Sequence, residues 1–274
     1  MQKQSPAVYF LSDAHLGSGR TAEARGASLV ARLRELRGHA THLYLLGDLF
    51  DFWFEYHHAI PKGHFRILRA LAELVDAGVP VDYFGGNHDF WCGSYLQREV
   101  GLRVHHSPQR VTHQGRSIFL AHGDGLGPGD RGYRILKAIL RHPLAIGLYR
   151  LLHPDWGIPF AYRVSHISRQ HTAGRETILR RLAAYVAAPR YAAGDDAVVI
   201  GHVHDPQHLR DGRGRDFLIV GDWLEHFSWV RLADGAFTLE RQWEDRIETV
   251  PAGRWPTGSD PTELLAAKNP TDRD

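Results

Sequence analysis

The chain has little cysteine, little excess charge and no uninterrupted apolar run, and each shortage excludes a class of protein. Of its 274 residues only Cys92 is a cysteine, which rules out an internal disulfide and favours a reducing compartment. It also disfavours a zinc module with cysteine ligands, so imidazole and carboxylate groups remain as candidate metal ligands. Lysine and arginine number 33 against 31 aspartates and glutamates, and the net charge of +2 gives no indication of nucleic-acid binding.

No segment has the pattern of a membrane span or a secretion signal. The most apolar long stretch, residues 135–152, is interrupted by Lys137, Arg141 and Arg150, which are too many charges for a helix in hydrocarbon. Residues 1–6 are polar and lack the apolar core of a signal peptide. We therefore expect a cytoplasmic protein that is soluble or sits on a surface.

Short runs rich in valine, isoleucine, tyrosine and phenylalanine alternate with helical periodicity in the first 90 residues. This alternation predicts βαβ units on a largely parallel sheet. Helices are predicted over residues 22–37 and 65–77, where apolar residues recur at helical spacing. Strands are predicted over residues 8–12, 43–46, 81–84, 117–121, 197–200, 217–220 and 228–232. Tight turns between the later strands favour antiparallel pairing, so the predicted class is α/β with mixed sheets.

Two regions depart from this alternation. Residues 130–188 hold no convincing strand and mix basic with apolar residues, which predicts a helical insertion or lid within a domain covering residues 1–243. An amphipathic helical hairpin buried against the protein is the alternative interpretation. Residues 244–274 are rich in proline, glycine, threonine and aspartate and are predicted to form a flexible C-terminal tail.

Chemistry-bearing residues follow the ends of five predicted strands, next to a glycine or a turn. The five motifs are Asp13-Ala14-His15, Gly47-Asp48-Leu49-Phe50-Asp51, Gly85-Gly86-Asn87-His88-Asp89, His122-Gly123-Asp124 and Gly201-His202-Val203-His204. Taken singly, each has an ordinary explanation, such as a helix N-cap or a turn. The ordered set does not, and ligands of such folds bind at the carboxyl ends of the strands.

These residue types favour a site for two metal ions. Asp13 and His15, two positions apart, would lie on one side of an extended segment and hold one ion. His202 and His204 have the same spacing and can be shared between neighbouring ions. Asp48 can bridge them because its two oxygens offer separate lone pairs. Two cations roughly 3.5–4 Å apart bind a phosphorus ester, generate a bridging hydroxide and offset charge in an in-line displacement.

With these motifs assembled, the chain resembles the calcineurin-like metallophosphoesterases. Their pattern of D-x-H, G-D-x-x, G-N-H-D/E, a histidine and G-H-x-H is matched in order. The resemblance implies a four-layer αββα sandwich of two mixed β-sheets, and two divalent ions, most commonly Mn²⁺, with iron or zinc in other members. It implies that one ion is held by Asp13, His15, Asp48 and His204 and the other by Asp48, Asn87, His122 and His202.

The same resemblance implies catalytic roles beside the metal ligands. His88 follows the ligand Asn87 and matches the histidine that contacts the phosphate and protonates the departing oxygen. Asp51 lies three residues after Asp48, where the family has an aspartate that orients this histidine. Such a carboxylate would raise the pKa of the imidazole and keep it cationic. Cys92 has no evident partner base and is interpreted as a packing residue.

A narrower resemblance, over about residues 7–243, is to the UDP-2,3-diacylglucosamine pyrophosphohydrolases of lipid A synthesis. It rests on Gly47-Asp48-Leu49-Phe50 with Trp53, on His122-Gly123-Asp124-Gly125-Leu126 followed by Asp130 and Tyr133, on the insertion, and on Gly221-Asp222-Trp223. It implies hydrolysis of an acylated nucleotide sugar to UMP and 2,3-diacylglucosamine 1-phosphate, by attack of a metal-bridging hydroxide.

The insertion is the expected cover of the substrate. Successive motifs are separated by 33, 39 and 35 residues up to His122, whereas 80 residues separate His122 from His202. Within the insertion, Ser168, Thr172 and Arg175 have the spacing of the family's Ser-x3-Asn-x2-Lys substrate contacts. The predicted substrate contacts are Asn87, His88, Asp130, Tyr133, Ser168, Arg175 and His202.

One motif departs from the narrower family. Many of its members have Gly-Asn-Arg-Asp where this chain has His88, so Arg20 or Arg131 is a candidate to replace that arginine as a phosphate contact. Two other interpretations stay open: a metallophosphoesterase acting on another phosphodiester or nucleotide, and a non-catalytic binding module, which predicts lost ligands.

The lid also suggests a partner other than the substrate. Its basic and apolar faces would give peripheral binding to the cytoplasmic face of the inner membrane. No nucleic-acid partner is expected, and nothing in the sequence indicates an oligomeric state.

Overall fold

The computed structural model describes residues 5–126, 131–168, 175–244 and 246–268, and these form two mixed β-sheets packed face to face. The first sheet has seven strands in the order β12-β11-β10-β1-β2-β3-β4. Its parallel half consists of β1 (Ala7–Leu11), β2 (Ala40–Leu45), β3 (Val81–Phe84) and β4 (Arg103–His105). Its antiparallel half consists of β10 (Ser228–Ala233), β11 (Ala236–Trp243) and β12 (Arg246–Val250).

The second sheet has six strands in the order β13-β8-β9-β7-β6-β5. These strands are β5 (Gln109–His113), β6 (Arg116–Ala121), β7 (Ala197–Ile200), β8 (Gln207–Arg210), β9 (Asp216–Ile219) and β13 (Gly253–Arg254). Strands β6, β7 and β9 are parallel, whereas β5 and β8 pair antiparallel with their neighbours. The strands that the sequence predicts are all present, and the mixed sheets are confirmed.

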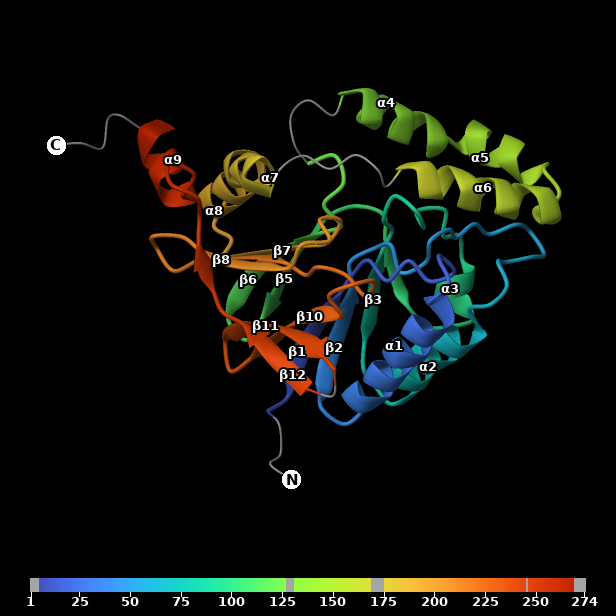
Figure 1. The fold of residues 1–274 in the computed structure, drawn as a ribbon, viewed down its shortest axis with the longest axis horizontal. Helices are drawn as coiled ribbons and strands as arrows, with labels where there is room; N and C mark the ends of the chain where they lie inside the picture. Colours follow the sequence, from blue (N-terminus) through green and yellow to red (C-terminus); the bar gives the residue numbers. More distant parts are fainter. Residues whose placement is uncertain (1–4, 127–130, 169–174, 245, 269–274) are drawn as a thin grey trace.

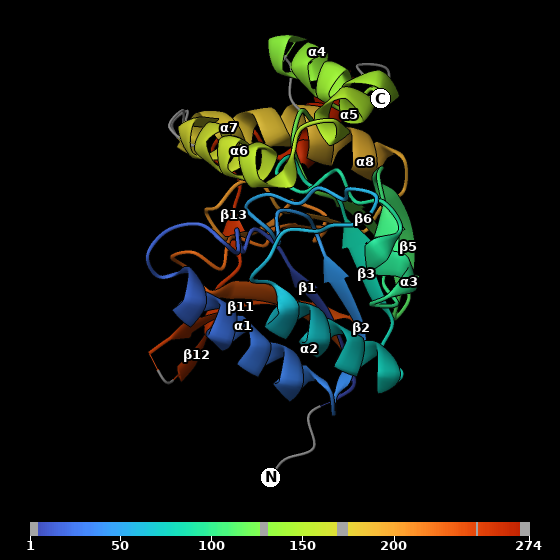
Figure 2. The same ribbon diagram turned by 90° about the vertical axis from the view of Figure 1, so that its right-hand side faces the viewer.

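Helices cover the outer face of each sheet, which gives four layers (Figures 1 and 2). The first sheet is covered by α1 (Ala22–Leu36) and α2 (Phe65–Asp76), with the short α3 (Tyr95–Arg98) at its edge. The second is covered by α7 (Arg175–Leu182), the π-helix η1 (Ala183–Ala187), α8 (Ala188–Ala192) and α9 (Pro261–Lys268). Strand β1 is buried on both faces, because Val8 and Phe10 point between the sheets while Tyr9 and Leu11 pack towards the helices. The predicted αββα sandwich is confirmed.

Three helices stand apart from these layers and are called the lid below (Figure 1). They are α4 (Arg131–Leu140), α5 (Pro143–Arg150) and α6 (Pro154–Ser168). Helix α7, which the sequence places in the insertion, belongs to the body because Leu179 and Leu182 are buried in the outer core of the second sheet. In the described part of the chain, no helix combines the length and apolarity needed to cross a membrane.

The C-terminal segment differs from the flexible tail that its composition predicts. Between residues 246 and 268, β12 extends the first sheet, β13 pairs with β8 and α9 packs on the second sheet. Trp255 is buried against Phe217 with ring centroids 5.0 Å apart, and Asp260 accepts a 2.8 Å hydrogen bond from the Thr262 N–H at the start of α9. Short polar edge strands carry a weak sequence signal, which is why the composition suggested disorder.

Candidate dinuclear metal centre

The five sequence motifs meet where the carboxyl ends of β1, β2 and β3 face those of β6 and β7. Two clusters of predicted ligands form there, and a third group of possible ligand atoms, from His15, Asp48 and His88, lies between them. The first cluster holds Asp13, His15 and His204, and all of its ligand atoms lie within 4.8 Å of one another. The Nε2 atoms of His15 and His204 are 3.3 Å apart, and Asp13 Oδ1 lies 3.8 Å from the first and 3.4 Å from the second.

The second cluster is formed by Asp48, His122 and His202, with Asn87 beside them. His122 Nε2 lies 3.4 Å from Asp48 Oδ2 and 3.0 Å from Asn87 Oδ1. The His122 and His202 rings are 5.1 Å apart between centroids. Oxygen and imidazole nitrogen donors of this kind suit divalent transition metals.

Asp48 connects the two clusters through one oxygen. Its Oδ2 lies 3.8 Å from His15 Nε2 and 3.4 Å from His122 Nε2. Its Oδ1 accepts a 2.8 Å hydrogen bond from the His88 backbone N–H. The expectation that its two oxygens would serve separate ions thus differs from the structure, in which the backbone of the third motif occupies Oδ1.

A cation fits the first cluster by an independent criterion. Asp13 Oδ1 is buried with no hydrogen-bond partner among the described residues, whereas Asp13 Oδ2 accepts a 2.8 Å bond from the His202 N–H and a short one from Ser12. A buried carboxylate oxygen without a donor is costly unless a positive charge faces it. The donor set of both clusters therefore fits two divalent ions.

The ligands are placed by backbone conformations that the sequence did not indicate. Asp13, His15, Asp48 and His202 all have positive φ, of 53°, 42°, 52° and 65°. Non-glycine residues rarely adopt this left-handed region, and such strain concentrates at functional sites. The prediction that Asp13 and His15 share one side of an extended segment is therefore wrong, because β1 ends at Leu11 and both residues lie beyond it with positive φ.

Gly86 and Gly201 lie where these turns approach one another too closely for a side chain. A Cβ at Gly86 would lie 2.1 Å from Asp48 Oδ1, and a Cβ at Gly201 would lie 1.9 Å from Ser12 Oγ and 2.7 Å from Asp13 Oδ2. Any side chain at either position would displace a proposed ligand. The glycines of the G-N-H-D and G-H-x-H motifs therefore make room for the carboxylates of the other motifs.

Buried groups behind the ligands fix their orientation. Asp89 accepts hydrogen bonds from the backbone N–H groups of Asp48, Phe50 and Gly86, at 3.2, 3.2 and 2.9 Å, and from the Tyr83 hydroxyl. It thereby joins the turn after β2 to the turn after β3. No role is predicted for Asp89 from the sequence, although its place in the G-N-H-D motif is the available signal.

Of the proposed histidine ligands, His122 is oriented by a hydrogen bond at its second ring nitrogen, and His204 has a carboxylate near its own. His122 Nδ1 donates to the Leu46 carbonyl at 2.7 Å, which leaves its Nε2 for the cluster. Asp222 Oδ2 lies 3.7 Å from His204 Nδ1, and Asp222 Oδ1 accepts backbone bonds of 2.9–3.1 Å from the three residues Leu224, Glu225 and His226. Contacts of this kind set the tautomer and orientation of metal-binding imidazoles.

The charges of the two clusters are strongly interdependent. Burial raises the pKa of Asp48, but His122 and His88 lower it more, so that it lies well below its usual value. Burial lowers the pKa of His122, but the Asp48 carboxylate raises it more, to about 10. Burial and the neighbouring His122 lower the pKa of His202 to about 4. The carboxylates are therefore anionic and available to a cation at neutral pH.

His88 and Asp51 lie beside the clusters in an arrangement that differs from the predicted one. His88 Nδ1 lies 3.1 Å from the Asp51 main-chain carbonyl but 4.0 Å from its carboxylate Oδ1. That carboxylate is nearer to His15, whose Nδ1 is 3.3 Å from Oδ1. Burial lowers the pKa of His88 despite the raising effect of Asp48 and Asp51, so the expected cationic imidazole is not what this environment favours by itself.

A cavity of about 310 Å³ opens beside the centre and beneath the lid. Asp51, Asn87 and His88 line its inner end. Most of the rest of its lining is apolar or aromatic and comes from the loops after β2 and β3 and from the lid, including Phe52, Phe54, Trp91, Leu136, Leu140, Ile146, Tyr149, Phe160 and Val164. The size and lining are typical of a small-molecule site.

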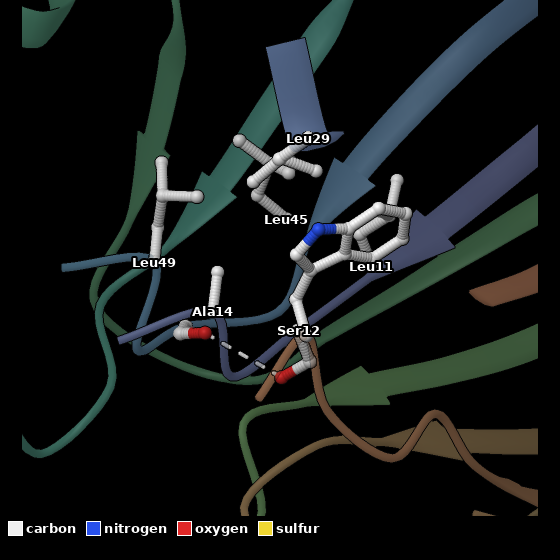
Figure 3. Close-up of a pocket in the computed structure, with 8 residues that line it drawn as sticks. Leu11, Ser12, Ala14, Leu29, Leu45 and Leu49 are labelled. Carbon is white, nitrogen blue, oxygen red and sulfur yellow. Dashed lines mark hydrogen bonds between the residues drawn. The ribbon is translucent and has the colours of Figure 1, made fainter. Parts of the chain in front are cut away.

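The core behind the centre is closely packed in comparison. A cavity of about 10 Å³ lies there between Ser12, Ala14 and the side chains of Leu11, Leu29, Leu45 and Leu49 (Figure 3). Ser12 Oγ lies 3.4 Å from the Gly47 carbonyl at its edge. This volume is about that of a single probe sphere, so this side of the centre offers no room for a substrate.

The structure does not test the substrate contacts predicted for the insertion. Asp130 and Thr172 lie outside the described residues, and the structure places Tyr133 in α4 and Ser168 in α6 without describing their side chains. Arg175 is exposed at the start of α7 and forms a 2.9 Å ion pair with Asp205. These contacts therefore remain predictions.

Comparisons with known proteins fit this geometry. No family model matches the chain. The chain is similar to the UDP-2,3-diacylglucosamine hydrolase of Porphyromonas gingivalis, with 36% identity over 259 residues, 87% of this chain and 98% of that protein. Proteins with the same name from Stenotrophomonas maltophilia and Edwardsiella ictaluri are 32% and 31% identical, over 84% and 85% of this chain and 96% and 92% of their own.

Two solved structures also resemble the chain. A single mutant of Vps29 from Entamoeba histolytica has a TM-score of 0.46 and 16% identity, over 89% of this chain and 98% of that one. A dimetal phosphatase from Danio rerio has a TM-score of 0.44 and 14% identity, over 90% of this chain and 99% of that one.

Proposed function

The chain belongs to the family of UDP-2,3-diacylglucosamine hydrolases, and we propose that it cleaves the diphosphate of UDP-2,3-diacylglucosamine to UMP and 2,3-diacylglucosamine 1-phosphate in lipid A biosynthesis. The observation that carries this function is that two ligand clusters, connected through Asp48, lie beside an apolar cavity of about 310 Å³. Paired cations suit the diphosphate, and the cavity suits the acyl chains.

The residues divide into two sets of metal ligands. Asp13, His15, Asp48 and His204 would hold one divalent ion, and Asp48, Asn87, His122 and His202 the other, with Mn²⁺ as the proposed ion. When bound, two such ions neutralise phosphoryl charge and make water a stronger nucleophile. No covalent protein nucleophile is needed, and Cys92 is buried with its thiol donating to the Asp89 carbonyl.

His88 is proposed to act on the diphosphate from the side of the cavity. Its Nδ1 donates to the Asp51 carbonyl at 3.1 Å, which turns Nε2 away from that loop. A bound diphosphate would raise the pKa of this imidazole by its negative charge. His88 would then donate a hydrogen bond or a proton to a phosphoryl oxygen as water adds to phosphorus and the bridging P–O bond breaks. Asp51 serves as a positioning residue for His88 and His15.

The lid is proposed to bind the acyl chains on its inner face and a membrane on its outer face. Leu151 and Trp156 are 82% and 76% exposed, and Leu144 and Leu148 are exposed beside them. Apolar residues with flanking basic side chains bind the surface of anionic bilayers. This would place the protein on the cytoplasmic face of the inner membrane. Sedimentation with anionic vesicles at low salt tests this, and Trp156→Ser should reduce the bound fraction.

Release of UMP from the diacylated substrate tests the reaction. The protein supplied with Mn²⁺ should release UMP and the acylated sugar phosphate, and His122→Ala should release neither. Full metal loading without turnover of this substrate would contradict the function. Hydrolysis of small phosphodiesters in that case would favour the alternative substrate classes. A non-catalytic module is disfavoured because every expected ligand is present.

A further inference from the structure

The inner end of the cavity beneath the lid carries positive charge that the proposed mechanism does not use. Lys137 on α4 and Arg141, the residue directly after the end of α4, line this cavity together with Asn87 and His88. The rest of its lining is largely apolar or aromatic. These two basic side chains lie beside the proposed metal centre rather than at the solvent-facing rim of the cavity, and this position needs an explanation.

Arg141 is held against the loop that carries Asn87. Its guanidinium carbon lies 3.4 Å from the centroid of the Phe90 ring, and its Nη2 donates to the Gly86 carbonyl at 3.1 Å. The side chain is 20% exposed, so it neither extends into solvent nor is sealed from the cavity. A planar guanidinium stacked in this way is preorganised for paired hydrogen bonds to phosphate.

Lys137 increases the positive charge at the same place. Its Nζ lies 2.5 Å from Asp124 Oδ2, and Arg141 Nη2 is 3.7 Å from the same oxygen. Lys137 and Arg141 thus place two positive charges around one nearly buried carboxylate, and Asp51 is the acidic residue among those that line the cavity. An anion entering between the lid and Asn87 would meet these positive charges.

We propose that Arg141, supported by Lys137, binds the phosphate attached to the acylated sugar. The inference rests on the proposed function, because it needs a substrate with acyl chains and phosphate on one sugar. The acyl chains enter the apolar cavity, so the phosphate nearest to them lies at its inner end beside Arg141. The nucleotide then extends past His204, whose side chain is 34% exposed and does not line the cavity.

Two other arginines, Arg20 and Arg131, are candidates from the sequence for a phosphate contact. Arg20 is exposed and does not line the cavity, and the side chain of Arg131 lies outside the described residues. Arg141 instead reaches the loop of His88 from the lid. A lid residue thus supplies the guanidinium that the third motif lacks, and the lid contributes to phosphate recognition as well as to acyl binding.

The experiment compares two ligands that differ only in phosphate. Calorimetry on Mn²⁺-loaded protein would measure the binding of 2,3-diacylglucosamine 1-phosphate and of 2,3-diacylglucosamine. Arg141→Gln should weaken the first by about 10- to 100-fold, since charge-assisted hydrogen bonds are lost, and leave the second unchanged. Equal weakening of both ligands, or of neither, would overturn the proposal.

Arg150→Gln is the matched control. Arg150 also lies on the lid, donates to a body carbonyl, that of Glu55, at 3.3 Å, and lies 6.0 Å from the Phe54 ring, but it does not line the cavity. Its replacement should leave both ligands unchanged. If Arg150→Gln weakened binding of the phosphorylated ligand as much as Arg141→Gln does, the effect would come from the overall charge of the lid. That result would overturn the assignment of Arg141.

A second variant covers the case in which Arg141→Gln does not fold. Arg141→Lys keeps the charge and most of the stem but not the planar fork, so phosphate-dependent binding should fall by about 10-fold. Unchanged phosphate binding in this variant overturns the proposal. If the wild-type protein binds neither ligand, the proposed substrate fails and this inference fails with it. If the wild-type protein binds both ligands with similar affinity, the proposed substrate stands and only the role of Arg141 is contradicted.

Discussion

The strand-end turns and the lid differ in how deeply they bury their side chains and in how they are held in place. The turns bury Asp13, His15 and Asp48 almost completely and join neighbouring loops through hydrogen bonds such as those of Asp89. The lid leaves large apolar side chains exposed and contacts the body through side chains such as Lys137 and Tyr149, while Trp91 of the body donates to the Leu140 carbonyl at 3.0 Å. In the proposed function the body would carry the chemistry and the lid would select the substrate.

The largest effect is expected inside the turns. His122→Ala removes a ligand of the second cluster, and turnover should fall by about 1000-fold or more because charge on the phosphoryl group loses its compensation. Metal content measured by mass spectrometry should fall with it. His57→Ala, on an exposed loop, is the control. Normal turnover in His122→Ala would break the assignment of the strand-end turns as the reactive region.

Replacement of a group behind the ligands should have a smaller effect. Asp89→Asn keeps the shape but replaces one acceptor oxygen with a donor that faces backbone N–H groups. The affinity for Mn²⁺ should fall by about 10- to 100-fold, as for other groups that orient metal ligands. Titration of the metal-free protein measures this, and Asp234→Asn in an exposed turn is the control. An unchanged affinity would show that the turns hold their shape without Asp89.

A change in the lid should separate substrate choice from chemistry. Phe160 lines the cavity from α6, and Phe160→Ala removes apolar surface that an acyl chain would bury. KM for the diacylated substrate should rise about 10-fold, while hydrolysis of a small phosphodiester stays unchanged. Leu151→Ala, on the outer face, should change neither. Equal losses on both substrates would mean that the lid also shapes the reactive centre.

The smallest effect on activity is expected from the charges that stabilise the body. Asp216 is buried and accepts hydrogen bonds from His208, Arg210 and Arg116 at 2.7–2.8 Å. Burial raises the pKa of Asp216, but these bonds lower it more, so that it lies below its usual value. A lowered folded-state pKa gives stability that is complete above the unfolded-state pKa and is lost as the pH falls through the folded-state pKa.

Asp216→Asn should therefore lower the free energy of unfolding by about 3 kcal/mol at pH 7, with turnover unchanged under native conditions. The difference from the wild type should shrink as the pH falls below about 4. Urea unfolding at several pH values measures this, with the exposed Asp76→Asn as the control. A pH-independent difference would mean that packing, rather than charge, is what the variant loses.

The sequence predicts the body well because its signals are local and repeated. Apolar strands alternate with amphipathic helices, and the carboxyl ends of the strands meet in the fold, so motifs far apart in the chain form one centre. The details of that centre depend on contacts that no local pattern contains. Asp48 faces both clusters with one oxygen because the His88 N–H occupies the other. The positive φ of Asp13 depends likewise on the packing of the turns.

Other features were missed because their signals were weak or ambiguous. Strands β4, β8 and β13 have two to four residues, most of them polar, so they lack the apolar run that marks other short strands such as β7. Helix α7 carries the basic and apolar mixture of the lid, yet Leu179 and Leu182 assign it to the body. The position of Arg141 over Phe90 depends on how the lid docks, which spacing along the chain does not specify.

The proposed ligands come from both sheets, with Asp13, His15, Asp48 and Asn87 following strands of the first and His122, His202 and His204 following strands of the second. Ions held between them would act as a cross-link between two halves that otherwise adhere through the apolar layer of Phe10, Leu46, Ile118 and Val199. Folding and metal supply would then be thermodynamically linked, since ligands that assemble only in the folded chain add their binding free energy to its stability. A cell short of the ion would hold a protein that is less resistant to unfolding as well as inactive.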